Sequence, residues 1–197
     1  MPTRKMVGSE YDSQRLAGMY SMCSSLLPYP SYSLLWIGPV TNPQLGLIGL
    51  GNIGLQIANL AQALGFKRII YHTRTPNLSC PEYTHVSLND LYAESDAIVI
   101  TCPLNNSTRG MINDKAFEGM KEDMILVNVA RGPIVDDEAL VRALDSGKGM
   151  SSPLKWEVLI IVRRAALDVF TNEPEIHPGL INDYRVVSPP SVRSDID

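Results

Sequence analysis

Six short apolar runs are spaced along the chain between residues 45 and 187. They lie at residues 45–50, 68–71, 96–101, 124–129, 165–170 and 185–187. Each run predicts a buried strand, because it is apolar along its whole length rather than at alternate positions. Strands of this kind are typical of a parallel sheet covered on both faces, so the pattern predicts an α/β fold with a doubly wound sheet. Residues 1–43 lack this pattern, and we expect the domain to begin near residue 43.

Two segments between these runs predict helices. After the first run, apolar residues recur at helical spacing and a glycine ends them (Ile57, Leu60, Ala61, Leu64 and Gly65). The second helix covers the sequence ALVRAL, with Asp136 as a suitable N-cap and Gly147 as a stop signal. Helices that alternate with strands in this way supply the layers that cover the predicted sheet.

Composition narrows the class of protein. The chain has 197 residues, 45% of them hydrophobic, which is enough for one globular domain with a core. A net charge of −4 without any basic block argues against nucleic-acid binding. Cys23, Cys80 and Cys102 form no CxxC pair, so we expect neither a disulfide framework nor a metal site, and a cytoplasmic location. Prolines interrupt the apolar residues 16–40, so we predict an irregular segment rather than a membrane span.

The first apolar run leads into LIGLGNIG, in which Gly49, Gly51 and Gly54 fit the pattern G-x-G-x-x-G. This pattern has physical meaning because it follows a predicted strand and opens a predicted helix. The first glycine permits a tight turn, the second lets the backbone approach a pyrophosphate, and the third lets helix and strand pack closely. The N–H groups and positive dipole end of the helix then favour phosphates. We therefore predict a Rossmann-type dinucleotide site, with a glycine-rich turn that holds no ligand as the alternative.

The residues after the second predicted strand bear on which dinucleotide binds. NAD-binding versions usually carry Asp or Glu about 20 residues after the glycines, to accept from the ribose 2′-hydroxyl. Residues 55–81 contain no Asp or Glu, and the strand ends in YHTRT. Arg74 suits a 2′-phosphate because its planar guanidinium makes paired charge-assisted bonds. Further donors would come from His72, Thr73 and Thr75. We therefore favour NADP(H) over NAD(H), with a merely solvated Arg74 as the alternative.

Four segments occur in one order: LIGLGNIG, TCPLNNSTRGMIN, MKEDMILVNVARGPIVDDEALVRALDSGK and AALDVFTNEPEIHPGL. In this combination the chain resembles the D-isomer-specific 2-hydroxyacid dehydrogenases, and YHTR is most similar to the glyoxylate/hydroxypyruvate reductase branch. The resemblance covers most of residues 44–187. It implies an oxidoreductase that transfers hydride between NADPH and a 2-oxo acid such as glyoxylate or hydroxypyruvate.

The resemblance also implies which residues contact the cofactor. Asn52 and Ile53 would offer backbone N–H groups to the pyrophosphate. Cys102 and Pro103 would line the adenosine side, and Thr108 would lie near the cofactor.

At the reactive end, the resemblance implies that Val129 and Ala130 lie beside the nicotinamide and that Asp168 holds its carboxamide. Arg131 would bind the carboxylate and carbonyl of the 2-oxo acid, since a guanidinium can anchor an acid and polarise a carbonyl. Glu173 would orient a catalytic histidine and raise its pKa. The alternatives are a surface ion pair for Arg131 and cap or turn roles for Asp168 and Glu173.

The histidine itself is not found where the family has it. Ketone reduction needs a proton donor, and in the family a histidine follows a proline shortly after the last of these strands. Here the sequence reads VVSPPSV, so matching Pro190 to that proline puts Ser191 in the place of the histidine. His72 belongs to the ribose end, His85 is expected to be structural or exposed, and His177 lies in an HPGL turn. We therefore expect impaired catalysis by this chain.

Other segments depart from the family pattern. Residues 149–161 separate the SGK sequence from the next predicted strand, either as a surface insertion or as a translated intron, which we favour. Residues 1–43 do not resemble the family's upstream half, which forms most of the substrate domain. We therefore predict an irregular segment at 1–43, an NAD(P)-binding Rossmann domain at 44–190 with an insertion at 149–161, and a tail at 191–197. The substrate domain is then largely missing.

Three functions follow from these observations. The first is an NADPH-dependent reductase of a 2-oxo acid, with a small 2-oxo or 2-hydroxy acid as partner. The second is a non-catalytic cofactor-binding module, like the related C-terminal binding protein corepressors that use the cofactor-bound fold for protein association. The third is a mis-assembled gene product. A homodimer is left open, because the family's upstream region commonly takes part in dimerisation.

Overall fold

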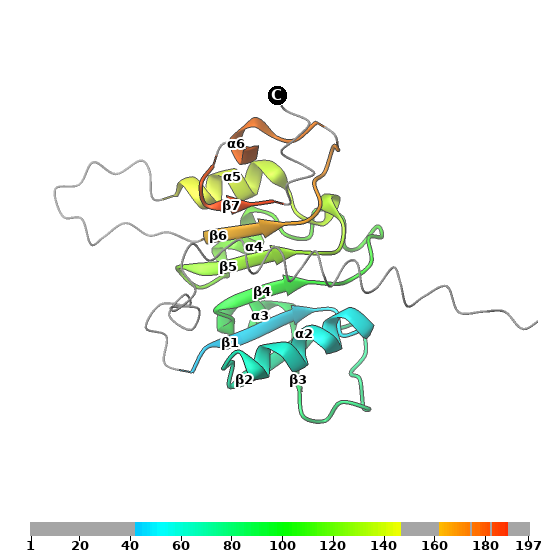
Figure 1. Ribbon diagram of the computed structural model, residues 1–197. Coiled ribbons are helices and arrows are strands. Elements are labelled where there is room, and N and C mark those ends of the chain that lie inside the picture. Colours follow the sequence, from blue (N-terminus) through cyan, green and yellow to red (C-terminus); the bar gives the residue numbers. More distant parts are fainter. Residues whose placement is uncertain (1–41, 147–161, 174, 182, 189–197) are drawn as a thin grey trace, which may run out of the picture.

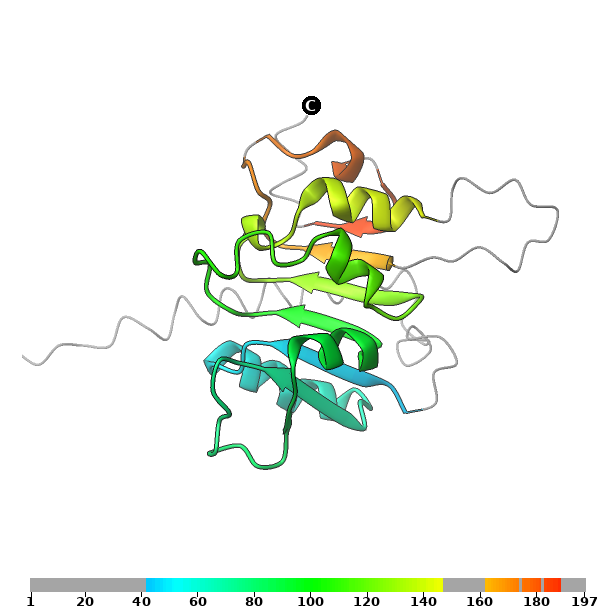
Figure 2. The same ribbon diagram turned by 180° about the vertical axis from the view of Figure 1, so that it is seen from behind.

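The computed structural model describes residues 42–146, 162–173, 175–181 and 183–188. The predicted insertion at 149–161, the predicted tail at 191–197, and all but the last two residues of the predicted N-terminal segment lie outside these ranges. Within the described residues, a single twisted sheet carries helices on both faces (Figures 1 and 2). The predicted doubly wound, Rossmann-type α/β fold is confirmed.

The sheet has seven strands in the order β3-β2-β1-β4-β5-β6-β7, and every neighbouring pair is parallel. The strands are β1 (Gln44–Ile48), β2 (Arg68–His72), β3 (Thr84–His85), β4 (Ala97–Ile100), β5 (Met124–Asn128), β6 (Val162–Leu167) and β7 (Val186–Val187). The chain runs outward from β1 to β3 and then restarts on the other side of β1 with β4. The order therefore reverses between β1 and β4, which is where sheets of this type bind ligands.

Helices cover the two faces of the sheet unequally. They are α2 (Asn52–Ala63), α3 (Leu88–Glu94), α4 (Asp114–Glu118), α5 (Asp137–Asp145) and α6 (Pro178–Ile181), with a short 3₁₀ turn at Gly132–Ile134. Helix α2 lies in front of the sheet in Figure 1, whereas α3, α4 and α5 lie on the opposite face, seen in Figure 2. The side chain of Asp136 accepts a hydrogen bond from the Ala139 N–H, which confirms the predicted N-cap of α5.

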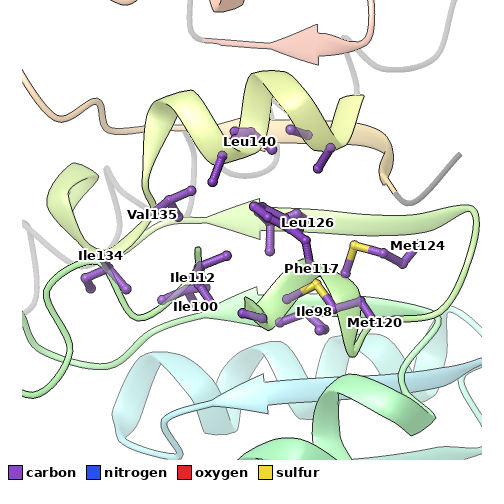
Figure 3. Packing of buried hydrophobic residues seen from close by; sticks show 14 of the residues in the cluster. Ile98, Ile100, Ile112, Phe117, Met120, Met124, Leu126, Ile134, Val135 and Leu140 are labelled. Atoms are coloured by element: carbon purple, nitrogen blue, oxygen red, sulfur yellow. The ribbon is translucent and has the colours of Figure 1, made fainter. Parts of the chain in front are cut away.

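Buried residues form two clusters that correspond to these two faces. The smaller cluster joins β1, β2 and β4 to α2, with Leu47, Ala58 and Tyr71 among its members. The larger cluster lies beneath α3, α4 and α5, and Figure 3 shows its centre, where residues of β4 and β5 meet Phe117 and Leu140. Because alternate residues of a strand point to opposite faces, strands that are apolar throughout can feed both clusters. This accounts for the uninterrupted apolar runs in the sequence.

Several elements differ from the prediction. Strand β3 and helices α3 and α4 were not predicted. Strand β6 begins at Val162 and ends at Leu167, so the run at 165–170 is wrong by three residues at each end. Helix α2 buries Gly54, Ile57, Ala58 and Ala61, whereas Leu64 is 60% exposed. Two residues of the predicted helix face, Leu60 and Leu64, therefore do not enter the core. No helix among the described residues is long and apolar enough to cross a membrane.

Candidate cofactor and catalytic site

The predicted site residues within the described ranges lie at the carboxyl ends of the strands: His72 is the last residue of β2, and the others follow strands. The strands concerned are β1, β2, β4, β5 and β6. The arrowheads in Figure 1 point the same way, toward these ends. The parallel sheet therefore brings together segments that lie more than 100 residues apart in the sequence.

The turn between β1 and α2 has the geometry that its three glycines predict. Gly49 has a φ of 106°, and an added Cβ there would lie 2.9 Å from the Cys102 nitrogen. A Cβ on Gly54 would lie 2.6 Å from the Gly49 oxygen, so this glycine lets α2 approach the turn. A Cβ on Gly51 would meet nothing within 4 Å. Gly49 and Gly54 are thus required by packing, whereas the space beside Gly51 is open to a ligand.

Thr101, which sequence reasoning missed, fastens this turn to the neighbouring strand. It follows β4, and its hydroxyl donates to the Gly49 oxygen at 2.9 Å. The same oxygen atom of Thr101 lies 3.2 Å from the position of a Cβ on Gly54. The hydroxyl therefore contacts both ends of the glycine turn. In the sequence, the only signal of this role was a threonine at the end of an apolar run. Its partner, Gly49, is 52 residues away.

The first turn of α2 presents bare backbone N–H groups. Gly51 is its N-cap and supplies no side-chain hydrogen bond, and no acidic residue lies in the first turn. The first N–H groups of any helix lack partners within the helix, and those of Asn52 and Ile53 have no acceptor among the described residues. Bare N–H groups, a positive dipole end and the open space beside Gly51 fit the diphosphate of a dinucleotide.

The segment after β2 is held by hydrogen bonds that leave Arg74 exposed. His72 Nδ1 lies 3.0 Å from the Val86 oxygen, and the Thr73 hydroxyl donates to the Thr75 oxygen at 2.7 Å. Arg74 and Thr75 are exposed, and Arg74 forms no ion pair with any residue that the structure describes. The guanidinium at the end of β2 is therefore available to an anion, whereas the hydroxyl of Thr73 is already engaged as a donor.

The loop after β4 is closed on itself by Thr108. Its hydroxyl donates to the Pro103 oxygen at 2.8 Å and accepts from the Asn105 N–H at 2.8 Å. Cys102 is half-buried beside the glycine turn, and burial raises the pKa of its thiol. Cys102 is therefore a neutral lining residue, and Thr108 shapes the loop that would border the cofactor.

The segment after β5 places one exposed cation beside a buried turn. Val129 and Ala130 are buried, and Arg131 is exposed, with its Nη1 donating to the Ala130 oxygen at 2.6 Å. Asn128, another residue that sequence reasoning missed, is 1% exposed and bonds to both Ala130 and Arg131. The available signal in the sequence was an asparagine within the apolar run at 124–129. The turn that presents Arg131 is therefore fixed from inside the protein.

The segment after β6 packs directly on this turn. A Cβ on Gly132 would lie 1.9 Å from the Phe170 oxygen, so only glycine permits the two loops to meet. Asp168 donates its backbone N–H to the Asn128 oxygen at 3.1 Å. The Glu173 carboxylate accepts from the Phe170 N–H at 2.8 Å, so one of its oxygens holds a turn. Arg131, Asp168 and Glu173 therefore lie in adjoining loops.

The histidines have different structural roles. His85 Nε2 lies 2.9 Å from the Thr73 oxygen, which fits the structural role expected for it. His177 pairs with Glu138 at 3.0 Å, at the N-terminus of α5, and lines a cavity of about 640 Å³ with residues that include Arg109, Asp137 and Thr171. None of the predicted site residues lines that cavity. Pro190 and Ser191, where the family's histidine was sought, lie outside the described residues.

Comparison with known families identifies this arrangement. The model of the NAD-binding domain of D-isomer-specific 2-hydroxyacid dehydrogenases matches residues 37–191. The chain belongs to this family. A 4-methyl-2-oxopentanoate reductase A of Aspergillus oryzae is 41% identical over 166 residues, which cover 80% of this chain and 46% of the relative. The family membership expected from the sequence motifs is confirmed.

Solved structures agree with this assignment. A glyoxylate reductase from Paecilomyes thermophila superposes with a TM-score of 0.67 at 33% identity, over 92% of this chain and 52% of the other. An NADPH-dependent glyoxylate/hydroxypyruvate reductase from Sinorhizobium meliloti, in complex with NADP and malonate, gives a TM-score of 0.70 at 28% identity, over 98% and 59%. The chain therefore spans about half the length of the relatives it matches.

Proposed function

We propose that this chain is the cofactor-binding half of an NADPH-dependent 2-oxo acid reductase, with glyoxylate or hydroxypyruvate as the substrate class. The observation that carries the proposal is the meeting, at one sheet edge, of a bare helix N-terminus and an exposed arginine held by a rigid turn. The first binds a diphosphate through backbone N–H groups. The second binds a carboxylate.

Each group has a distinct chemical task in this proposal. NADPH supplies the hydride when it is bound. Asn52 and Ile53 hold the diphosphate, and Asp168 holds the carboxamide of the nicotinamide. Arg131 anchors the carboxylate of the acid and polarises its carbonyl, because guanidinium N–H groups stabilise the negative charge that develops on the oxygen. Nη1 of Arg131 would become available to the acid once it gives up its hydrogen bond to the Ala130 oxygen.

The preference for NADPH over NADH rests on Arg74. The residue is exposed at the carboxyl end of β2 and pairs with no described acid, so a 2′-phosphate would meet an uncompensated guanidinium. NADH has only a hydroxyl there, and no described carboxylate follows β2 before Glu82 to accept its proton. The complex of the Sinorhizobium meliloti reductase with NADP supports this choice.

Titration of intrinsic and cofactor fluorescence with NADPH and NADH tests the preference. The wild-type chain should bind NADPH at least tenfold more tightly, and Arg74→Asp should lose that ratio, since a charge-assisted bond contributes about 1.5–3 kcal/mol. Lys67→Asp makes the same charge change at the opposite end of β2 and should leave the ratio unchanged. An unchanged ratio in Arg74→Asp would remove Arg74 from the proposal.

A non-catalytic cofactor-binding module is the second candidate, and the sequence VVSPPSV favours it because a serine stands where the proton donor is expected. Oxidation of NADPH with hydroxypyruvate or glyoxylate separates the two only if turnover is seen. We expect tight NADPH binding with negligible turnover by these 197 residues. Clear turnover would refute the expected impairment and favour the reductase. We further propose a cytoplasmic location and leave a homodimer to measurement by sedimentation.

A further inference from the structure

Asn128 lies at the centre of the hydrogen bonds that organise the reactive end of the site. It is the last residue of β5 and is 1% exposed. Its Oδ1 accepts from the Ala130 N–H at 3.0 Å, and its Nδ2 donates to the Arg131 oxygen at 3.0 Å. Its own backbone oxygen accepts from the Asp168 N–H at 3.1 Å. One buried residue is therefore bonded to three residues of the site, which lie in the two segments after β5 and β6.

The two side-chain bonds determine the course of the backbone between β5 and the 3₁₀ turn. The Arg131 oxygen also accepts from the Ile134 N–H at 3.3 Å, so the asparagine and the turn hold the same carbonyl from two sides. Because Arg131 has extended backbone angles (φ −148°, ψ 139°), this carbonyl fixes the direction in which its side chain leaves the turn. Asn128 therefore fixes the direction in which the Cα–Cβ bond of Arg131 leaves the backbone, and it also holds Ala130, whose oxygen accepts from the guanidinium.

We propose that Asn128 is a positioning residue for the bound acid: it contacts neither substrate nor cofactor, but orients Arg131 relative to Ala130 and Asp168. This inference rests on the proposed function, which assigns the acid to Arg131. The position needs one acceptor and one donor at fixed separation, and the amide supplies both. Aspartate keeps the acceptor and loses the donor, whereas leucine loses both at similar volume.

The rest of the turn is held without Asn128. Gly132 packs against Phe170 through direct backbone contact, and the 3₁₀ turn closes with its own hydrogen bonds. Loss of the amide should therefore change the direction of Arg131 without dissolving the loop. This separation makes the proposal distinguishable from a purely structural role.

The test compares Asn128→Asp and Asn128→Leu with Ser95→Ala in the full chain. Ser95 is also buried, and Ser95→Ala also removes a hydrogen bond, from the Ser95 hydroxyl to the Leu91 oxygen. Ser95 precedes β4, however, so it lies at the amino ends of the strands, opposite the site. NADPH is titrated first, and oxalate, a mimic of a 2-oxo acid, is titrated into the complex. Oxalate affinity should fall about tenfold in Asn128→Asp, the value of one lost buried bond, and further in Asn128→Leu.

NADPH affinity should fall less than oxalate affinity in the Asn128 variants, because the proposed phosphate contacts lie at α2 and after β2, and β4 separates β5 from β1. Ser95→Ala should keep the oxalate affinity of the wild type. Equal oxalate affinity in Asn128→Asp and wild type would overturn the inference and leave the proposed function standing. Failure of the wild type to bind NADPH would instead overturn the proposed function.

A second readout needs no ligand. The Nε–H resonance of Arg131, assigned through its loss in Arg131→Lys, reports the conformation of that side chain directly. We expect it to shift or broaden in Asn128→Asp and to stay in place in Ser95→Ala. An unchanged resonance in Asn128→Asp would overturn the positioning role whatever the chain binds.

Discussion

The two strand-to-helix turns of the site, β1–α2 and β5–α5, differ in whether their own residues fill them and satisfy their hydrogen bonds. The β1–α2 turn leaves its helix uncapped, carries no acid in the first turn, and keeps open space beside Gly51. The β5–α5 turn is filled: Asn128 crosses it, Gly132 meets Phe170, and the Asp136 side chain caps the helix. Both turns begin at the carboxyl ends of the strands, so the difference between them lies in their residues and hydrogen bonds and not in their location in the sheet.

The difference indicates what each turn contributes. An uncapped turn leaves its hydrogen bonds to be completed by a ligand, which suits a diphosphate bound through the backbone. A turn whose own groups are satisfied can instead hold one side chain in a fixed direction, and here that side chain is Arg131. Filling the open space beside Gly51 in the first turn should therefore affect ligand binding alone, whereas filling the packed contact at Gly132 in the second should affect folding and binding together.

The largest expected effect is that of Gly132→Ala. The new Cβ would lie 1.9 Å from the Phe170 oxygen, which is a backbone atom and cannot swing aside. We expect a loss of about 3 kcal/mol or more in the free energy of unfolding, at the upper end of overpacking effects. Urea denaturation followed by circular dichroism measures it. A loss below about 1 kcal/mol would mean that the two loops are not in direct contact.

Gly51→Ala is the matched control for that variant. Its Cβ meets nothing, and its backbone angles (φ −86°, ψ −164°) are open to alanine, so the free energy of unfolding should change by only a few tenths of a kcal/mol. NADPH affinity should nevertheless fall about tenfold or more, because the methyl group would occupy the space of the diphosphate. NADPH binding at wild-type strength by Gly51→Ala would show that the ligand does not approach this turn.

A smaller effect is expected at Thr101, which ties the first turn to β4. Thr101→Val removes the hydroxyl that donates to the Gly49 oxygen, at a cost of about 1 kcal/mol, and should weaken NADPH binding several-fold because the glycine turn loosens. Thr101→Ser keeps the hydroxyl and should retain most of the affinity. Equal affinity in the serine and valine variants would mean that packing alone holds the turn.

The sequence predicted the parts of the fold that depend on uninterrupted apolar runs. Strands β1, β2, β4 and β5 have four or five residues each and are buried or partly buried on both faces along most of their length, so their composition identifies them. Strand β3 has only two residues, and α4 has five, so neither is long enough to show a period. Leu64 follows the helical spacing, but it is the C-cap of α2 and is 60% exposed. Its burial is decided by what packs against the end of the helix rather than by the period of the sequence.

The site was predicted where a motif lies within one segment and missed where partners are distant. The glycine pattern and the ARG segment are local, so the sequence alone was enough to single out their residues, and the roles assigned to them stay predictions. Thr101 acts through Gly49, which lies 52 residues away and is brought to it by the order of the strands. Asn128 was missed for another reason: the side-chain partners Ala130 and Arg131 are local, but only the fold shows that Asn128 is buried.

The smallest expected effect concerns the acids at the start of α5. Burial raises the pKa of Asp137 above its ordinary value, as do the charges of Asp136 and Glu138, although the nearby Thr171 side chain and the charge of His177 oppose this. A raised folded-state pKa means that the folded chain holds this proton more tightly than the unfolded chain, so stability is lost as pH rises through that pKa. Asp137→Asn removes the penalty. Its free energy of unfolding at neutral pH should exceed that of the wild type.

This gain should be well under about 1 kcal/mol, because solvent screens the half-buried carboxylate. It should vanish as pH falls below about 4, where the aspartate is protonated in both states. Asp114→Asn at α4 is a control of opposite sign: Arg142 lowers the pKa of Asp114, so its loss should destabilise the chain above pH 4. Thermal unfolding between pH 3 and pH 8 compares them. Destabilisation by Asp137→Asn at pH 7 would show that the charge of Asp137 stabilises the N-terminus of α5. The cluster of acids at that N-terminus would then raise the free energy of unfolding rather than lower it.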